Sequence, residues 1–178
     1  MLNVPLFAGF MYAAVGSFIA RIWRLFYFGF TRHPPLPAIG LLSIAIYANF
    51  FAHHYMADMR YLLFVAAGLL FGRTWLYFKV WRVHRRMPLL LACFLTAFFL
   101  WVAENIGTMT KVWLYPHQLA GWSPVSIAKL GSWFLTLIIS YTLVAIIHKP
   151  QEIGRGAGRP RRPAVLVLRE GLEARNAG

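Results

Sequence analysis

Long apolar runs constrain the fold of this chain more than any other feature of its sequence. A helix that crosses a bilayer needs about 20 mainly apolar residues, and backbone polar groups in hydrocarbon must be hydrogen-bonded within the segment, which favours helices. Together with an apolar content of 60%, the runs predict an all-α fold, a polytopic transmembrane helical bundle of about five spans within residues 1–150. The five runs cover residues 1–20, 34–52, 61–78, 87–103 and 130–147.

The basic residues are distributed unevenly between the connections of these runs. Fourteen Lys and Arg residues follow the first, third and fifth runs, whereas Arg60, Lys111 and Lys129 fall in the other two connections. Because cytoplasmic loops carry the excess of Lys and Arg, we expect an inner-membrane protein with an external N-terminus and a cytoplasmic C-terminus. The net charge of +13 then reflects contact with anionic membrane lipid, and no nucleic-acid partner is expected.

Two segments outside the spans differ from ordinary loops. Residues 151–178 are rich in Gly, Pro and Arg and are interpreted as a basic cytoplasmic tail. Residues 112–128 are uncharged and contain two prolines and two tryptophans, which predicts a re-entrant or interfacial segment. Such a segment would cover the external end of the bundle and bring Tyr115 and His117 to it, although a plain aromatic belt explains the tryptophans as well.

Ionisable residues gather at the predicted external end. His54 and Asp58 follow the second run at a spacing of four residues, which places them on one helical face if the helix continues. Glu104 and Asn105 end the fourth run and should arrive at the same depth. Carboxylates near a bilayer are costly and therefore functional candidates, whereas the plainer interpretation of Glu104 is an interfacial ion pair with Arg60 or Lys111.

These residues define a candidate site with three roles. Glu104, His54 and Asp58 are the candidate catalytic groups, and His54, Asp58 and His117 are candidate metal ligands. Asn105, Thr108, Tyr115 and Arg73 are candidate substrate contacts, with Arg73 placed near the cytoplasmic end of the third run, where it could bind a lipid phosphate. Lys129 would counter Glu104 or Asp58. The sequence identifies no cofactor and no oligomeric state.

Several strings together resemble a known bacterial family of integral membrane proteins that is catalogued only as a domain of unknown function. They are His53-His54-Tyr55-x-x-Asp58-x-Arg60, Leu70-Phe71-Gly72-Arg73-Thr74-Trp75, His84-Arg85-Arg86-Met87-Pro88, Glu104-Asn105-Ile106-Gly107-Thr108 and Lys129-Leu130-Gly131-Ser132-Trp133. The resemblance covers about residues 4–150 and implies a membrane location without an activity. Members of that family are typically longer at the N-terminus, which implies that this chain is a shortened form.

A second run, Glu104-x-x-Gly107-Thr108-x-Thr110 followed by Tyr115, is similar to a stretch of the membrane carotenoid hydratases. That likeness implies an acidic residue that protonates an isoprenoid double bond, although the glycine-rich stretch after the motif is missing here. Three functions therefore remain open: a membrane enzyme acting on a lipid or isoprenoid, an ion- or proton-coupled transporter component, and a non-catalytic membrane subunit. Enzymatic activity itself is left open by the sequence.

Overall fold

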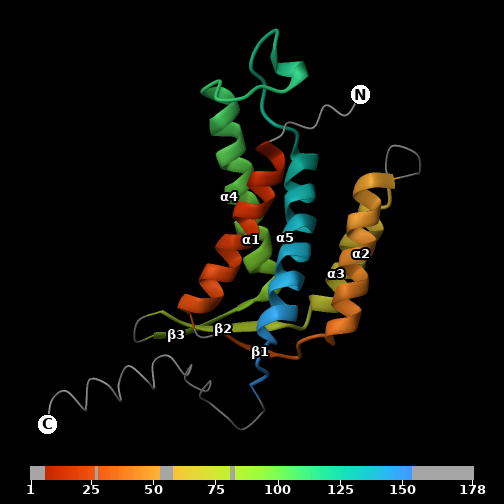
Figure 1. Ribbon diagram of the computed structural model, residues 1–178, viewed down its shortest axis with the longest axis vertical. Helices are drawn as coiled ribbons and strands as arrows, with labels where there is room; N and C mark the ends of the chain where they lie inside the picture. The colour runs from red at the N-terminus through yellow and green to blue at the C-terminus, as the bar shows by residue number, and fades with distance from the viewer. Residues whose placement is uncertain (1–6, 27, 53–57, 81–82, 154–178) are drawn as a thin grey trace, which may run out of the picture.

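A computed structural model of the chain describes residues 7–26, 28–52, 58–80 and 83–153. Within these residues it is mostly helical, with five α-helices whose directions alternate along a common axis (Figure 1). Each helix overlaps one of the five predicted runs. The helices are α1 (Phe7–Leu25), α2 (Leu36–Ala52), α3 (Arg60–Phe71), α4 (Leu89–Met109) and α5 (Ile127–His148).

A small antiparallel sheet closes the lower end of the bundle in Figure 1, so the prediction of a purely all-α fold is wrong. Its strand order is β1-β2-β3, with β1 at Phe28–Thr31, β2 at Trp75–Val80 and β3 at Val83–Pro88. Phe30 also bridges to Glu152, beyond α5. The connections after α1 and α3 and the segment after α5 therefore meet in one sheet.

The third predicted run is wrong in its last third. Helix α3 ends at Phe71, residues 72 and 73 form a turn, and β2 begins at Trp75. The run is apolar throughout, so its periodicity could not separate strand from helix, whereas the aromatic residues of β2 favour a strand. Arg73 consequently lies exposed in the turn beside the sheet and not inside a helix.

Helix α5 is the centre of the bundle and packs against α1, α2 and α4 (Figure 1). Two buried apolar clusters surround it. The larger one joins α2, α3 and α5 near the sheet through residues such as Ile46, Phe71 and Ile138, and the smaller joins Val15, Ala97 and Trp133 from α1, α4 and α5. The second cluster positions Trp133 next to the last turns of α4.

The outer faces of the helices are strongly apolar. Only 22% of the most apolar stretch of α4 is buried, against 50% of that of α5. Both helices are long and apolar enough to cross a membrane, and α2 and α3 are shorter apolar helices. Side chains such as Leu69 and Phe99 are 82% and 67% exposed, so the described surface includes large apolar groups on several helices.

Candidate functional site

One face of the last turns of α4 is polar and points at the loop that leads to α5. Trp101, Glu104, Asn105 and Thr108 follow one another at intervals of three, one and three residues, which places them on the same side of a helix. Each of the four forms at least one side-chain hydrogen bond to a group beyond α4. These hydrogen bonds attach the loop of residues 110–126, here called the lid, to this face of α4.

Glu104 is the central group of the face and is only 3% exposed. Its Oε1 accepts a hydrogen bond from the Tyr115 hydroxyl of the lid, and its Oε2 accepts one from the indole N–H of Trp133 in α5 at 2.9 Å. Among the described residues, no Lys or Arg forms a salt bridge with it. The buried carboxyl group of Glu104 therefore depends on two neutral hydrogen-bond donors from two different elements, because an unpaired buried charge is very costly.

Asn105 and Thr108 fasten the lid on either side of Glu104. The Asn105 side chain donates to the Trp101 carbonyl at 2.8 Å and accepts from the backbone N–H of Val125 at 2.9 Å. The Thr108 hydroxyl accepts from the indole of Trp122 at 3.2 Å. These two residues, expected as substrate contacts, are in hydrogen bonds with the lid and its neighbours.

The lid itself is folded around buried Gln118, which is 2% exposed. Its Oε1 accepts from the Tyr115 backbone N–H at 3.1 Å, and its Nε2 donates to the Ser123 carbonyl at 2.5 Å. Trp113 lies so close to Gly107 of α4 that a β-carbon there would clash with its ring. Glycine at this position thus lets the lid lie against the helix without a shift of the indole.

The ring of Tyr115 has a cation and an imidazole beside it. Lys129 Nζ lies 5.1 Å from the ring centroid, and the His117 ring is stacked on it at 5.8 Å with an interplanar angle of 8°. Lys129 was expected to counter a carboxylate, and the structure places it over the phenol that hydrogen-bonds to Glu104. The lid therefore brings both predicted aromatic residues to this end of the bundle.

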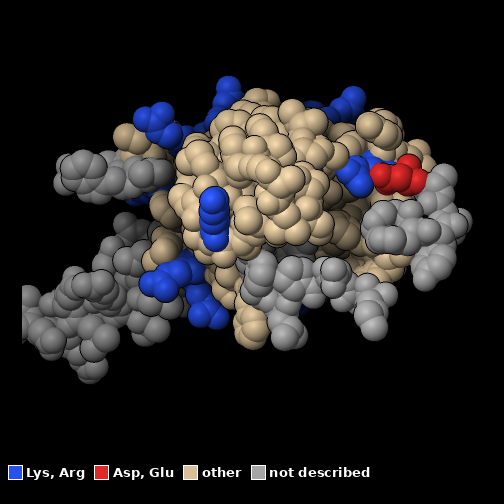
Figure 2. Space-filling model, turned by 90° about the horizontal axis from the view of Figure 1, so that it is seen from above, with Lys and Arg blue, Asp and Glu red and all other residues tan. Residues whose placement is uncertain are grey.

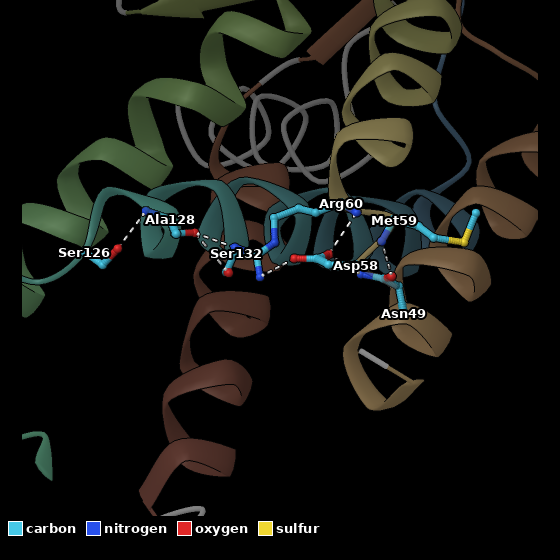
Figure 3. Close-up of polar contacts among 7 residues, drawn as sticks. All are labelled: Asn49, Asp58, Met59, Arg60, Ser126, Ala128 and Ser132. Carbon is cyan, nitrogen blue, oxygen red and sulfur yellow. Dashed lines mark hydrogen bonds and ion pairs between the residues drawn. The ribbon is translucent and has the colours of Figure 1, made fainter. Parts of the chain in front are cut away.

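Asp58 belongs to a second polar group at the start of α3 (Figure 3). Its Oδ2 lies 3.1 Å from Nη2 of Arg60, and its Oδ1 accepts from the Arg60 backbone N–H at 3.0 Å. Arg60 in turn donates to the Ala128 carbonyl of α5 at 3.3 Å. Arg60 is thus paired with Asp58, so the expected alternative of an Arg60–Glu104 ion pair does not form.

The predicted site residues are brought together only in part. Glu104, Asn105, Thr108, Tyr115 and His117 lie at the lid, Asp58 lies in the α3 group, and Arg73 lies at the sheet end. His54 falls outside the described residues. No group of three or more metal-binding side chains occurs in the part of the chain that the structure describes, and the metal and catalytic roles remain predictions.

Trp133 and Gln118 are the partners that sequence reasoning missed. Trp133 lies 29 positions from Glu104, and no spacing pattern in the sequence predicts their contact. A tryptophan inside an apolar helix needs a partner for its N–H when it is buried, and a carboxyl group in a neighbouring helix has the complementary requirement. The need of a buried indole for an acceptor and of a buried carboxyl group for a donor was therefore the indication of this contact that the sequence offered.

Comparison with known proteins places the chain in a family. A curated relative, "Uncharacterized protein YoaT" from Bacillus subtilis (strain 168), is 40% identical over 150 residues, which are 84% of this chain and 57% of the relative. The chain therefore spans a little over half the length of that relative. No solved structure matches it significantly. The family model described as "Protein of unknown function (DUF817)" matches residues 1–141, and the chain belongs to this family, as its sequence motifs predicted.

Proposed function

We propose that this chain is an integral membrane protein. The supporting observation is the exposed apolar surface of α4, where Leu91, Phe94 and Phe99 are 44%, 46% and 67% exposed. Exposing apolar area to water costs about 25 cal/mol per Å², and lipid removes that cost. The proposed orientation places the sheet end, where Lys79, Arg85 and Arg86 are exposed, at the cytoplasmic face.

Labelling of single cysteines tests this orientation. The described part of the chain has one cysteine, the buried Cys93, so Cys93→Ala supplies the background. We expect Lys111→Cys to react with a membrane-impermeant maleimide in intact cells, and Lys79→Cys to react only after permeabilisation. The reverse pattern would contradict the orientation, and release of the protein from membranes by alkaline carbonate would contradict the membrane location.

Within the membrane, we propose that the lid end transfers a proton to or from a lipid-soluble substrate, with Glu104 as the acid or base. The observation that carries this proposal is a buried carboxyl group held by a phenol and an indole. Carboxyl groups in apolar surroundings are the usual acid–base groups of such sites, and the lid of residues 110–126 limits the access of water.

Tyr115 is the proposed partner in this transfer. Its hydroxyl donates to Glu104, and Lys129 lies beside its ring. Opening of the lid would admit the substrate, because the hydrogen bonds of Glu104 are all made within the protein.

Replacing Glu104 by Gln tests the proposal, because glutamine keeps the shape of the side chain and removes its acid–base function. We expect cells carrying Glu104→Gln to accumulate a lipid that wild-type cells convert, detected by mass spectrometry of lipid extracts. Glu152→Gln makes the same chemical change at the sheet end of the bundle and should leave the lipids unchanged. Identical lipid profiles for a folded Glu104→Gln protein and the wild type would reject the acid–base role.

A further inference from the structure

A cavity of about 330 Å³ lies between α2, α3 and the first turn of α5, next to the Asp58–Arg60 pair. Its polar lining comes from three elements that are far apart in sequence and includes Asn49, Arg60, Ser126, Lys129 and Ser132. All five residues carry hydrogen-bond donors, but the Ser132 hydroxyl donates to the Ala128 carbonyl and the Asn49 amide to Asp58. The cavity therefore presents the positive charge of Arg60 and Lys129 to whatever occupies it.

The charge around the cavity is not fully compensated by the protein. Asp58 is the carboxylate paired with Arg60, whereas Lys129 lies over the ring of Tyr115. Two cations thus stand against one carboxylate among the described residues at this place. An arginine side chain has five N–H donors, and its contacts with Asp58 and Ala128 in the described part of the chain use two of them.

The start of α5 adds to the positive potential of the same wall. Ser126 is the N-cap of this 22-residue helix, with its side chain accepting from the Ala128 N–H at 3.3 Å. The N-terminus of a helix carries partial positive charge and favours anions. Here that end forms one side of a cavity whose other sides supply Arg60 and Asn49, so the helix terminus does not act alone.

The remaining lining is apolar and comes from Phe50 and Leu135. A small inorganic ion would leave these groups unused, whereas an amphiphile would place its first carbons on them. Arg60 and Lys129, on different elements of the lining, are cations that suit a phosphate group, which offers more acceptor oxygens than a carboxylate. Figure 2 shows that the surface seen from the lid end is otherwise mostly uncharged, with its acidic atoms in one patch beside basic ones.

We infer that this cavity binds the phosphate group of an amphiphilic ligand through Arg60 and Lys129. The inference deepens the proposed function and rests on it for the reaction, since it assigns the anionic end of the substrate. Lys129 lines the cavity and also lies 5.1 Å from the centroid of the Tyr115 ring. The phosphate of the bound ligand is therefore one residue away from the phenol that hydrogen-bonds to Glu104.

Binding is tested on the full chain in micelles of a phosphate-free maltoside detergent by the rise in unfolding temperature that a bound ligand causes. One arm adds inorganic phosphate or diphosphate to these micelles, and the other adds phosphatidic acid. We expect Lys129→Gln to weaken binding about tenfold or more, as loss of a hydrogen bond to a charged group does. Lys111→Gln removes an exposed lysine at the same end and should bind like the wild type.

The two arms distinguish the sources of the phosphate. A temperature rise with phosphatidic acid supports a lipid headgroup, whereas a rise with free phosphate or diphosphate and none with phosphatidic acid would overturn the assignment of an amphiphile. No rise in either arm, or equal losses in Lys129→Gln and Lys111→Gln, would overturn the inference. If Lys129→Gln does not fold, Arg60→Gln, which removes the other cation of the cavity, provides the same comparison, with an expected loss of about tenfold.

The variant Glu104→Gln separates this inference from the proposed reaction. It should retain phosphate binding, because Glu104 does not line the cavity, while the conversion of the lipid is lost. Binding that depends on Lys129 together with lipids unaffected by Glu104→Gln would remove the acid–base role and leave the phosphate site. Loss of lipid conversion in Glu104→Gln, with no phosphate binding by the wild type, would support the acid–base role and remove the phosphate site.

Discussion

The lid end and the sheet end of the bundle are held together by different means. At the lid end, side chains of α4 carry the loop through hydrogen bonds to Glu104, Asn105 and Thr108. At the sheet end, backbone groups form the ladders, from the Thr31–Trp75 pair to the bridge between Phe30 and Glu152. One end depends on particular side chains, whereas the other depends on bonds that almost any residue can form.

Because of this difference, the two ends of the bundle should tolerate substitution to different degrees. A backbone ladder survives the replacement of its side chains, since each residue supplies its own donor and acceptor. A buried carboxyl group such as Glu104 loses a partner with each replaced donor, and an unsatisfied charged group is costly. The lid end is therefore specialised around one side chain, which is the property expected of a functional site.

The largest effect is expected from Trp133→Phe, matched by Trp23→Phe near the sheet. Both changes remove the same part of an indole ring, but only Trp133 donates to Glu104. Trp23 packs against Phe30 with a centroid distance of 5.3 Å. We expect Trp133→Phe to lower the free energy of unfolding by about 2 kcal/mol more than Trp23→Phe, measured by denaturant titration in detergent.

Equal losses in these two variants would show that the Trp133–Glu104 hydrogen bond adds nothing beyond packing. The contrast between the two ends would then disappear, because the buried carboxyl group would not depend on its indole donor. A larger loss in Trp23→Phe would reverse the comparison and make the aromatic cluster near the sheet the more demanding end.

A smaller effect, at the sheet end instead of the lid end, is expected when the pH is lowered. At the sheet end His33 lies 2.8 Å from the Tyr141 hydroxyl, and burial lowers the pKa of His33 below its ordinary 6.5, against raising effects from Pro34 and Glu152. As pH falls below 6.5, the unfolded chain binds the proton first. The stability contribution of the neutral imidazole is therefore present above this pH and is lost below it.

Thermal unfolding of the wild type and His33→Gln between neutral and mildly acidic pH measures this contribution. The wild type should lose more stability on acidification than the variant, because glutamine does not titrate in this range. A steeper loss in His33→Gln would contradict the direction of the pKa shift. Glu104→Gln should leave this difference between wild type and His33→Gln unchanged, because the two groups lie at opposite ends.

The sequence predicted the helices better than it predicted what joins them. Long apolar runs are a strong indicator, and each of the five predicted runs overlaps a helix. The strand β2 was missed because its residues continue the apolar run of α3 without a break in polarity. Pairing of β1 with β2 joins residues 44 to 50 positions apart, and no local pattern records such a contact.

The candidate site was predicted in its composition more than in its contacts. The proline and aromatic content of residues 112–128 led to the expectation of a covering segment that carries Tyr115, and the structure shows Tyr115 bonded to Glu104. Asp58 was assigned to the same cluster from depth alone, whereas its partner is Arg60, two residues away. Depth orders residues along a bundle axis but does not fix which helix faces which.

The smallest expected effect is the same at both ends of the bundle and comes from backbone strain at single residues. Lys111 follows α4 with φ of 58°, and Arg32 follows β1 with φ of 53°, a region in which glycine avoids the crowding of a β-carbon. Lys111→Gly and Arg32→Gly should each raise the free energy of unfolding by about 0.5 kcal/mol, and Lys111→Ala, which removes the same side chain without relieving the backbone, should not. Because this strain is confined to one residue, it is independent of how either end is held. A gain at Arg32 accompanied by a loss at Lys111 would show that the Lys111 side chain itself supports the lid.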